Sequence, residues 1–158
     1  QWAVKCSSNF STKEAMMLGT AGMTAGLAIL SMADKLSLNK SKALVSGATG
    51  GVGSIGVKLL SQLGADVTAI TGKMDKKSWL KELGASKVLD RKRFIDSTNH
   101  PLSKGKYDIA LDVVGGRILS SIIACMNYDG IITTCGNVGG PKFETNVFPF
   151  ILLSLIHI

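Results

Sequence analysis

A cluster of glycines in the first third of the chain has the spacing of a phosphate-binding turn. Residues 48–53 read Ala-Thr-Gly-Gly-Val-Gly and fit the pattern A-x-G-x-x-G, one substitution away from the glycine fingerprint of dinucleotide-binding folds. Gly50, Gly51 and Gly53 permit a tight turn and a close approach of the backbone to a pyrophosphate. The N–H groups of a helix that starts after Gly51 would face the phosphates. The alternative is a glycine-rich connector that binds no nucleotide.

The end of the next predicted strand carries residue types that suit a phosphate on the adenine ribose. NAD-binding folds place an Asp or Glu about 20 residues after the glycines. Here Thr71, Gly72 and Lys73 occupy that position, and Asp66 stands at the opposite end of the strand. A hydroxyl, an N–H and an ammonium suit a 2′-phosphate, which a carboxylate would repel. The pattern therefore favours NADP(H), with an ordinary polar turn as the alternative. Arg91 either adds a second cation or is a solvated surface residue.

Two further strand ends are candidates to line the cofactor, because open α/β sheets bind ligands at the carboxyl ends of their strands. The residues concerned are Val114, Gly115 and Gly116 after the fourth predicted strand and Cys135, Gly136 and Asn137 after the fifth. We interpret Cys135 as a small buried hydrophobic residue rather than a nucleophile, because no recognisable motif places a base beside it. Asp112 lies inside a predicted strand, where a catalytic role and a hydrogen-bonded structural role both stay open.

Strands and helices are expected to alternate along most of the chain. A capping-box pattern at Ser11 and Glu14 predicts a short helix to about Leu18, and a second helix is expected from the small residues after Gly19 to about Ala33. The alternation predicts a doubly wound parallel α/β sheet of the Rossmann type. Predicted strands are 43–46, 66–71, 88–89, 107–114 and 131–135, and the further predicted helices are 52–63, 76–83 and 117–126.

The composition indicates one folded domain. The chain has 158 residues, of which 46% are hydrophobic and 18% charged, so a sizeable core can form. Three scattered cysteines and two histidines support neither a disulfide framework nor a Cys/His zinc site. No signal peptide opens the chain, and the longest apolar run, 147–156, is well short of the roughly 20 residues that a membrane helix needs. The expected protein is soluble, reduced and cytoplasmic.

The formal net charge of +7 is concentrated in one stretch. Between Gly72 and Lys106 ten basic residues stand against four acidic ones, which accounts for most of the excess. Because this stretch begins at the strand end expected to receive the 2′-phosphate, a cofactor pocket explains the charge better than nucleic acid does. Aromatic residues are only 6% of the chain, which leaves few stacking platforms for single-stranded RNA.

Four segments occur in an order that resembles the medium-chain dehydrogenase/reductases, namely the zinc-free, quinone oxidoreductase-like branch of the acryloyl-CoA reductase type. The resemblance covers roughly residues 2–152 and rests on 18–25, 46–54, 79–91 and 148–152. It implies an NADPH-dependent reductase of activated carbon–carbon double bonds such as 2-enoyl-CoA thioesters, with hydride transfer to the β-carbon. Reduction of a quinone is the alternative within this class, and a non-catalytic nucleotide-binding or RNA-binding module is the alternative outside it.

The resemblance also implies which residues meet the cofactor. Gly51, Val52, Gly53 and Ser54 would hold the pyrophosphate, Thr71, Gly72, Lys73 and Arg91 the 2′-phosphate, and Asn137 would lie by the nicotinamide with Thr24 beside it. Residues 47–53 also fit the glycine turn of the short-chain dehydrogenases, but those enzymes need a Tyr-x-x-x-Lys pair. Four residues after Tyr107 and Tyr128 stand Leu111 and Ile132, not lysine.

The resemblance further implies that parts of the enzyme are absent. Residues 1–42 would be a helical lead-in from a missing substrate domain, 43–152 the dinucleotide-binding domain, and 153–158 a truncation or non-native tail. A sixth strand would be missing, no catalytic residue is identifiable, and this piece alone is expected to be inactive. The full-length protein would be a homodimer with a small-molecule substrate, and no nucleic acid, membrane or metal is expected.

Overall fold

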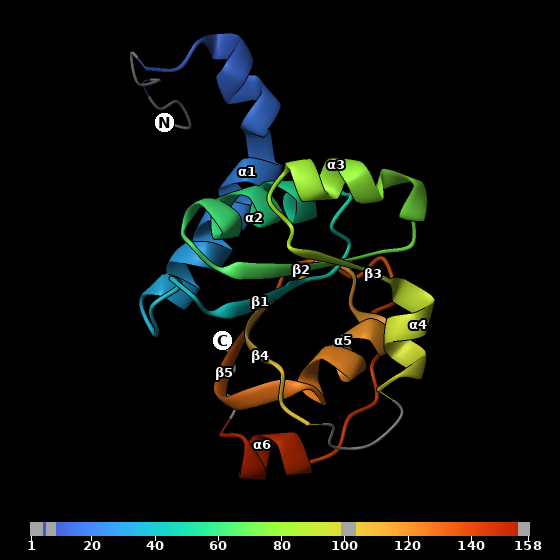
Figure 1. The fold of residues 1–158 in the computed structure, drawn as a ribbon. Coiled ribbons are helices and arrows are strands. Elements are labelled where there is room, and N and C mark those ends of the chain that lie inside the picture. The colour runs from blue at the N-terminus through green and yellow to red at the C-terminus, as the bar shows by residue number, and fades with distance from the viewer. Residues whose placement is uncertain (1–4, 6–8, 99–103, 155–158) are drawn as a thin grey trace.

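A five-stranded parallel sheet forms the centre of the molecule (Figure 1). The structure is a computed structural model and describes residues 5, 9–98 and 104–154. The strand order is β3-β2-β1-β4-β5, and every neighbouring pair runs parallel. The strands are β1 (Lys42–Val45), β2 (Asp66–Thr71), β3 (Lys87–Asp90), β4 (Tyr107–Asp112) and β5 (Met126–Thr134).

Helices cover both faces of the sheet, which confirms the doubly wound α/β prediction (Figure 1). On one face lie α1, α2 and α3, and on the other lie α4 and α5, with α6 beyond them. The helices are α1 (Thr12–Ala33), α2 (Gly51–Gln62), η1 (Met74–Lys76, a 3-10 turn), α3 (Lys77–Glu82), α4 (Arg91–Asp96), α5 (Gly116–Ile123) and α6 (Phe148–Leu152).

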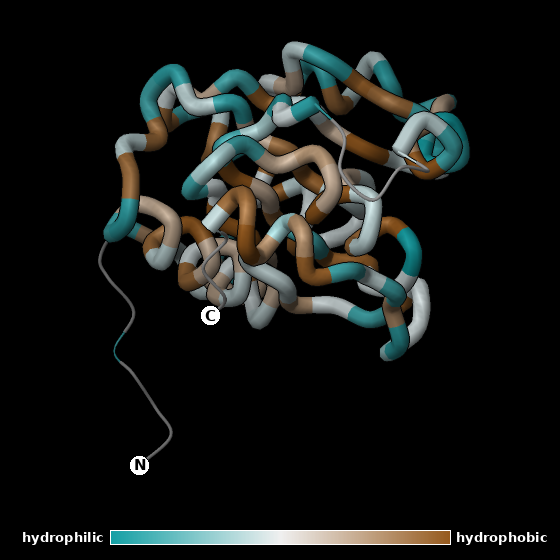
Figure 2. The backbone as a smooth tube through the Cα atoms, turned by 90° about the horizontal axis from the view of Figure 1, so that it is seen from below, coloured by the Kyte–Doolittle hydropathy of each residue, from teal (hydrophilic) through white to brown (hydrophobic). Residues whose placement is uncertain are grey.

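The apolar core has one layer on each face of the sheet, because successive side chains of a strand point to opposite faces. In β1, Val45 packs with α1 and α2 residues, whereas Leu44 packs with residues of α5. In β4, Leu111 packs in the layer that contains Val45, and Ala110 packs in the layer that contains Leu44. Hydrophobic segments accordingly run through the middle of the molecule, and hydrophilic residues gather at the surrounding turns (Figure 2).

Helix α1 joins the two helices expected from the sequence into one element with a break. Its N-cap is Ser11, and the capping box with Glu14 is present. At Gly19 the backbone leaves helical dihedrals, with φ 46° and ψ −148°, so the expected boundary survives as a kink. Glycine adopts this positive φ without strain, whereas a residue with a side chain would be strained there.

The two halves of α1 have different environments. Ala25, Ile29 and Met32 in the second half are buried against α2 and the sheet. In the first half Met16 and Met17 are 80% and 75% exposed, and this half projects away from the sheet (Figure 1). By length and composition alone α1 is long and apolar enough to cross a membrane, which was not expected from the sequence because the two predicted helices divide at Gly19. Its second half instead contributes to the core.

Acidification is expected to fray the first turn of α1. Hydrogen bonds from the Ser11 backbone N–H and hydroxyl to the Glu14 carboxylate lower the pKa of Glu14 from its ordinary value of 4.5. Because the pKa of Glu14 is lower in the folded chain, the stabilisation is fully present above the pKa of the unfolded chain. It is lost as the pH falls through the pKa of the folded chain. The measurement is the NMR shift of the Ser11 amide proton between pH 6 and pH 3 (about three pH units spanning the carboxyl's range). Glu14→Gln should remove this titration, and an unchanged titration in that variant would contradict the assignment.

Candidate nucleotide site

The sheet reverses its winding between β1 and β4, and this is where open α/β sheets bind ligands. From β1 the chain crosses through α2 to β2 and then to β3 on one side, and β4 returns to the other side of β1. The carboxyl ends of all five strands lie along one edge because the strands are parallel. The predicted site residues follow these ends, apart from Thr24 on α1.

The glycine-rich turn forms a tight link between β1 and α2. Gly47 has a φ of 55°, and its carbonyl accepts a hydrogen bond from Gly50 N at 2.8 Å. A Cβ built on Gly53 would overlap the Gly47 carbonyl, so the third glycine of the motif is required for helix and turn to pack. Helix α2 begins at Gly51 without a side-chain cap at Gly50. Its first backbone N–H groups therefore face the strand-end edge without a capping side chain.

The predicted residues after Gly51 lie in the first turn of α2. Val52 is half-buried and packs on the core, and the Ser54 hydroxyl donates to the Gly51 carbonyl at 3.1 Å. Helix α1 passes close by, since a Cβ on Gly51 would lie 3.3 Å from that of Ala21. Thr24 is half-buried one turn further along α1. The structure thus puts α1 beside the glycine turn, and a role for Thr24 at the nicotinamide stays a prediction.

The end of β2 is tied to the glycine turn by a pair of hydroxyls. The Oγ1 atoms of Thr49 and Thr71 are 3.1 Å apart, and Lys73 N donates to Thr71 Oγ1 at 2.9 Å. Thr71 is 2% exposed, so its hydroxyl shapes the turn that presents Lys73. Thr49 was not among the predicted site residues, because it occupies a variable position of the motif.

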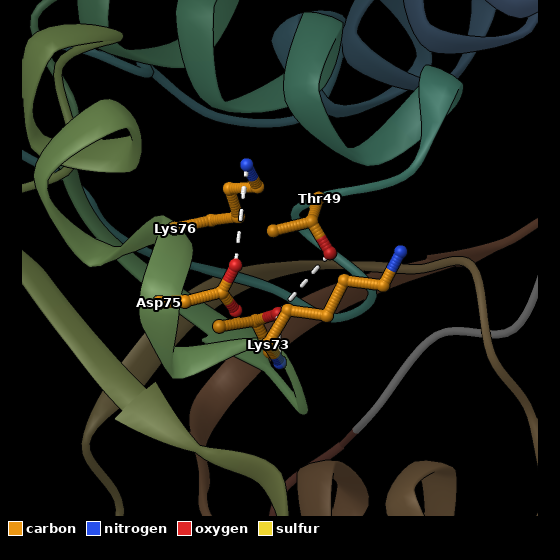
Figure 3. A network of polar contacts seen from close by, with 5 residues as sticks. Thr49, Lys73, Asp75 and Lys76 are labelled. Atoms are coloured by element: carbon orange, nitrogen blue, oxygen red, sulfur yellow. Dashed lines mark hydrogen bonds and ion pairs between the residues drawn. The ribbon is translucent and has the colours of Figure 1, made fainter.

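Two basic side chains reach this strand end, and no carboxylate in residues 5, 9–98 and 104–154 pairs with either. Arg91 begins α4, and its Nη2 lies 3.4 Å from where a Cβ of Gly72 would stand, so the guanidinium lies against the Gly72 backbone. Figure 3 shows Asp75 turned toward Lys76, with which it forms an ion pair of 3.9 Å, while the Lys73 side chain extends on the Thr49 side. Among the described residues neither Lys73 nor Arg91 has an ion pair. Both cations are therefore available to an anion.

The turns after β4 and β5 pack on each other. Cys135 N donates to the Asp112 carbonyl at 3.0 Å, and Gly139 N donates to the Val114 carbonyl at 2.7 Å. Val114 is 7% exposed, whereas Asn137 is exposed. The predicted pair of strand ends thus meets at one place, where Gly115 and Gly136 are in close backbone contact.

The expectation that Cys135 is buried is wrong. Its side chain is exposed because β5 is the edge strand and Cys135 lies just past its end. Partial desolvation, followed by the charge of Asp112, raises the pKa of the Cys135 thiol, which disfavours the thiolate. Buried Cys125 has its pKa raised to about 12 by burial. At Cys125 burial outweighs the opposing charge of Lys106, so neither described cysteine has the lowered pKa of a nucleophilic thiol.

Two further features bear on other kinds of site. A cavity of about 960 Å³ lies between α4, α5 and residues 141–149, and its lining includes Arg117, Ser121 and Lys142 but none of the predicted cofactor residues. Within residues 5, 9–98 and 104–154, no three His, Cys, Asp or Glu side chains gather as a metal site. Zinc independence of the whole enzyme stays a prediction.

Comparison with known sequences identifies a family. Residues 51–158 match the profile of the family described as zinc-binding dehydrogenase. YhfP of Bacillus subtilis, whose name assigns it provisionally to the quinone oxidoreductases, is 43% identical over 96% of this chain. Acrylyl-CoA reductase AcuI of Ruegeria pomeroyi is 34% identical over the same share. This chain covers 46% of either relative, so it spans less than half of their length.

Solved structures agree with the sequence comparison. The yhdH oxidoreductase of Salmonella enterica in complex with NADP superposes with a TM-score of 0.91 at 38% identity, over 98% of this chain and 47% of that one. B. subtilis yhfP with NAD bound superposes with a TM-score of 0.90 at 42% identity, over 96% and 46%. One of these two relatives was solved with NADP and the other with NAD.

Proposed function

The chain belongs to the zinc-binding dehydrogenase family, and on this premise we propose that it is the NADPH-binding part of a reductase of activated carbon–carbon double bonds. The chain is the NAD(P)-binding domain of a medium-chain dehydrogenase/reductase related to AcuI and YhfP. The proposed substrate is a 2-enoyl thioester of the acryloyl-CoA type. Its support is the similarity to AcuI over nearly the whole chain.

The residues of this chain supply the binding half of the proposed chemistry. The uncapped first turn of α2 would hold the pyrophosphate, and the end of β2 with Arg91 would hold the 2′-phosphate. The turns after β4 and β5, which include Val114 and Asn137, would face the nicotinamide end. When bound, NADPH supplies a hydride, which the proposal assigns to the β-carbon of the substrate.

The preference for NADPH rests on one observation. Lys73 and Arg91 lie at the end of β2 without carboxylate partners in the described part of the chain, and no Asp or Glu stands where an NAD-binding fold places one. This observation favours NADPH over NADH, because a 2′-phosphate would meet two cations there and a bare 2′-hydroxyl would not.

Titration of the chain with both reduced cofactors tests this proposal. NADPH should bind at least about tenfold more tightly than NADH, since a hydrogen bond to a charged group contributes roughly 1.5–3 kcal/mol. The readout is nicotinamide fluorescence at low ionic strength, repeated at high salt, where the difference should shrink. Equal affinities, or no binding of either cofactor, would contradict the proposal.

Reduction of a quinone is a second candidate, favoured by the name of YhfP. It uses the same cofactor site, so this chain does not separate the two substrates. Full-length enzyme supplied with NADPH and either acryloyl-CoA or a benzoquinone would do so, through the ratio of the two kcat/KM values. A homodimeric assembly and a cytoplasmic location stay predictions for the full-length protein.

A further inference from the structure

We propose that Asp112 is a positioning residue that fixes the phosphate-binding turn relative to the two turns beside the nicotinamide end of the cofactor. The inference rests on the proposed function and concerns a residue that the sequence left between a catalytic and a structural role. Asp112 is the last residue of β4, is 0% exposed, and stands at the point where the sheet reverses its winding. Its hydrogen bonds carry the argument.

The carboxylate of Asp112 accepts hydrogen bonds from two different turns. Oδ1 accepts from the Ser46 hydroxyl at 2.5 Å and from Val114 N at 3.2 Å, and Oδ2 accepts from Gly115 N at 2.9 Å. Ser46 is fully buried and directly precedes Gly47, the first residue of the glycine turn. Its hydroxyl also accepts from Val113 N at 3.0 Å. One side chain therefore connects the start of the glycine turn to the turn after β4.

The backbone of the same segment extends this connection to the turn after β5. The Asp112 carbonyl accepts from Cys135 N at 3.0 Å, and the Val114 carbonyl accepts from Gly139 N at 2.7 Å. Glycine at 136 lets the two turns touch, because a Cβ there would overlap the Val113 carbonyl. A displacement of residues 112–115 would thus move the loop that carries Asn137 as well.

A carboxylate fits this place better than any other side chain of similar size. Its three partners are a hydroxyl and two backbone N–H groups, so all of them donate in this arrangement. An asparagine has one carbonyl and one NH₂ group, and its NH₂ would face at least one N–H donor. Burying a carboxylate is costly unless hydrogen bonds compensate, and an apolar residue would suffice for packing alone. The hydrogen bonds that compensate this burial are the same ones that hold the turns in a fixed geometry.

Asp112→Asn separates positioning from general support of the fold. The probes are NADPH, which spans all three turns in the proposed mode, and adenosine 2′-monophosphate, which carries the 2′-phosphate without the 5′-phosphate and therefore reports on the end of β2. We expect the affinity for NADPH to fall about tenfold or more. The affinity for the monophosphate should stay within about twofold, because Asp112 bonds no residue of β2 directly and β2 meets the glycine turn through the separate Thr49–Thr71 contact. The fluorescence shift of bound nicotinamide should also diminish.

The matched control is Asp108→Asn on the same strand. The Asp108 carboxylate accepts from Lys42 N at 2.8 Å and from Asn127 Nδ2 at 2.7 Å, at the opposite edge of the sheet. It should leave both affinities within about twofold, since it touches none of the three turns. Urea unfolding of each variant sets the conditions under which it is fully folded. Ser46→Ala serves if Asp112→Asn does not fold. It removes the two hydrogen bonds of the Ser46 hydroxyl, to Asp112 and from Val113 N, and leaves the contacts of Asp112 with Val114 N and Gly115 N. It should weaken NADPH but not the monophosphate.

The possible outcomes separate the inference from the function beneath it. Equal losses for NADPH and the monophosphate, or an unchanged affinity for NADPH in Asp112→Asn and Ser46→Ala, overturn the positioning role while the proposed function stands. A wild-type chain that binds neither probe overturns both. Loss of NADPH alone, with Asp108→Asn unaffected, supports the assignment of Asp112.

Discussion

Lys73→Ala is expected to weaken the binding of NADPH by about 10- to 150-fold and to leave the binding of NADH within about twofold. The ammonium of Lys73 would meet the 2′-phosphate, and a charge-assisted hydrogen bond of this kind contributes roughly 1.5–3 kcal/mol. The backbone N–H of Lys73 is held on Thr71 Oγ1 at 2.9 Å, so removal of the side chain leaves the turn in place. The measurement is a fluorescence titration of both cofactors.

Lys76→Ala is the control for this change. Lys76 lies three residues away and is paired with Asp75 at 3.9 Å, on the neighbouring turn in Figure 3. Its removal deletes the same charge from the chain, so any loss due to net charge alone appears here too. A comparable loss of NADPH affinity in Lys76→Ala would assign the effect to the general field and not to a 2′-phosphate contact. Arg91→Ala should also lower the affinity for NADPH.

Leu111→Ala is expected to lower the free energy of unfolding by about 2–5 kcal/mol, the range for deleting a fully buried leucine. Leu111 lies in β4 and touches the backbone of α2 at Gly56, where a built Cβ would overlap Leu111 Cδ2. The same contact makes Gly56→Ala unfavourable, although alanine normally stabilises a helix relative to glycine by roughly 0.8–1 kcal/mol. Urea unfolding followed by circular dichroism measures each change.

The two substitutions should compensate in combination. In the Leu111→Ala background the space beside Gly56 is open, so Gly56→Ala is expected to change sign and to recover part of the lost stability. Gly26→Ala is the matched control, since a Cβ at Gly26 in α1 meets nothing within 4 Å. It should stabilise by roughly 0.8–1 kcal/mol in either background. Additive effects of Gly56→Ala and Leu111→Ala would show that the contact does not govern the packing of α2 on the sheet.

Regular elements with strong periodicity could be predicted from the sequence. Strand 66–71 agrees with β2, and the apolar spacing after the glycine turn predicted α2 to within a residue. Helix α4 was missed because it has six residues and buries only Phe94, so no periodic pattern arises. Its cap, an Asp90 carboxylate that accepts from Arg93 N, is a local signal that the sequence does contain.

Non-local pairing explains the larger differences. Strand β5 begins at Met126, five residues before the expected start, because Met126 pairs with Tyr107 across an irregular register. The register shifts between the Tyr107–Met126 and Ile109–Ile131 pairs, so residues 127–130 form an irregularity within β5, where Asp129 has a φ of 55°. Helix α5 accordingly ends at Ile123 and not near 126. The strand predicted to reach Val114 stops at Asp112, where its side chain begins to hold the next turn.

The candidate site divides in the same way. Motif spacing predicted the glycine turn and the Thr71–Lys73 segment, because local backbone chemistry defines them. The hydroxyl contact between Thr49 and Thr71 joins residues 22 positions apart, and that between Ser46 and Asp112 joins residues 66 apart. No local sequence pattern predicts either contact, because each contact depends on which strands become neighbours in the sheet.

Lys73 and Arg91, which have no ion pair in the described part of the chain, also have a kinetic consequence. A pair of positive groups at the mouth of a site draws anions from solution, which raises the association rate constant as well as the affinity. The screening length shortens from about 10 Å at 0.1 M ionic strength to about 3 Å at 1 M. The association rate constant of a phosphorylated dinucleotide should therefore fall steeply with added salt, and dissociation should change less. Lys73 and Arg91 would then determine how quickly the domain is loaded when cofactor is scarce.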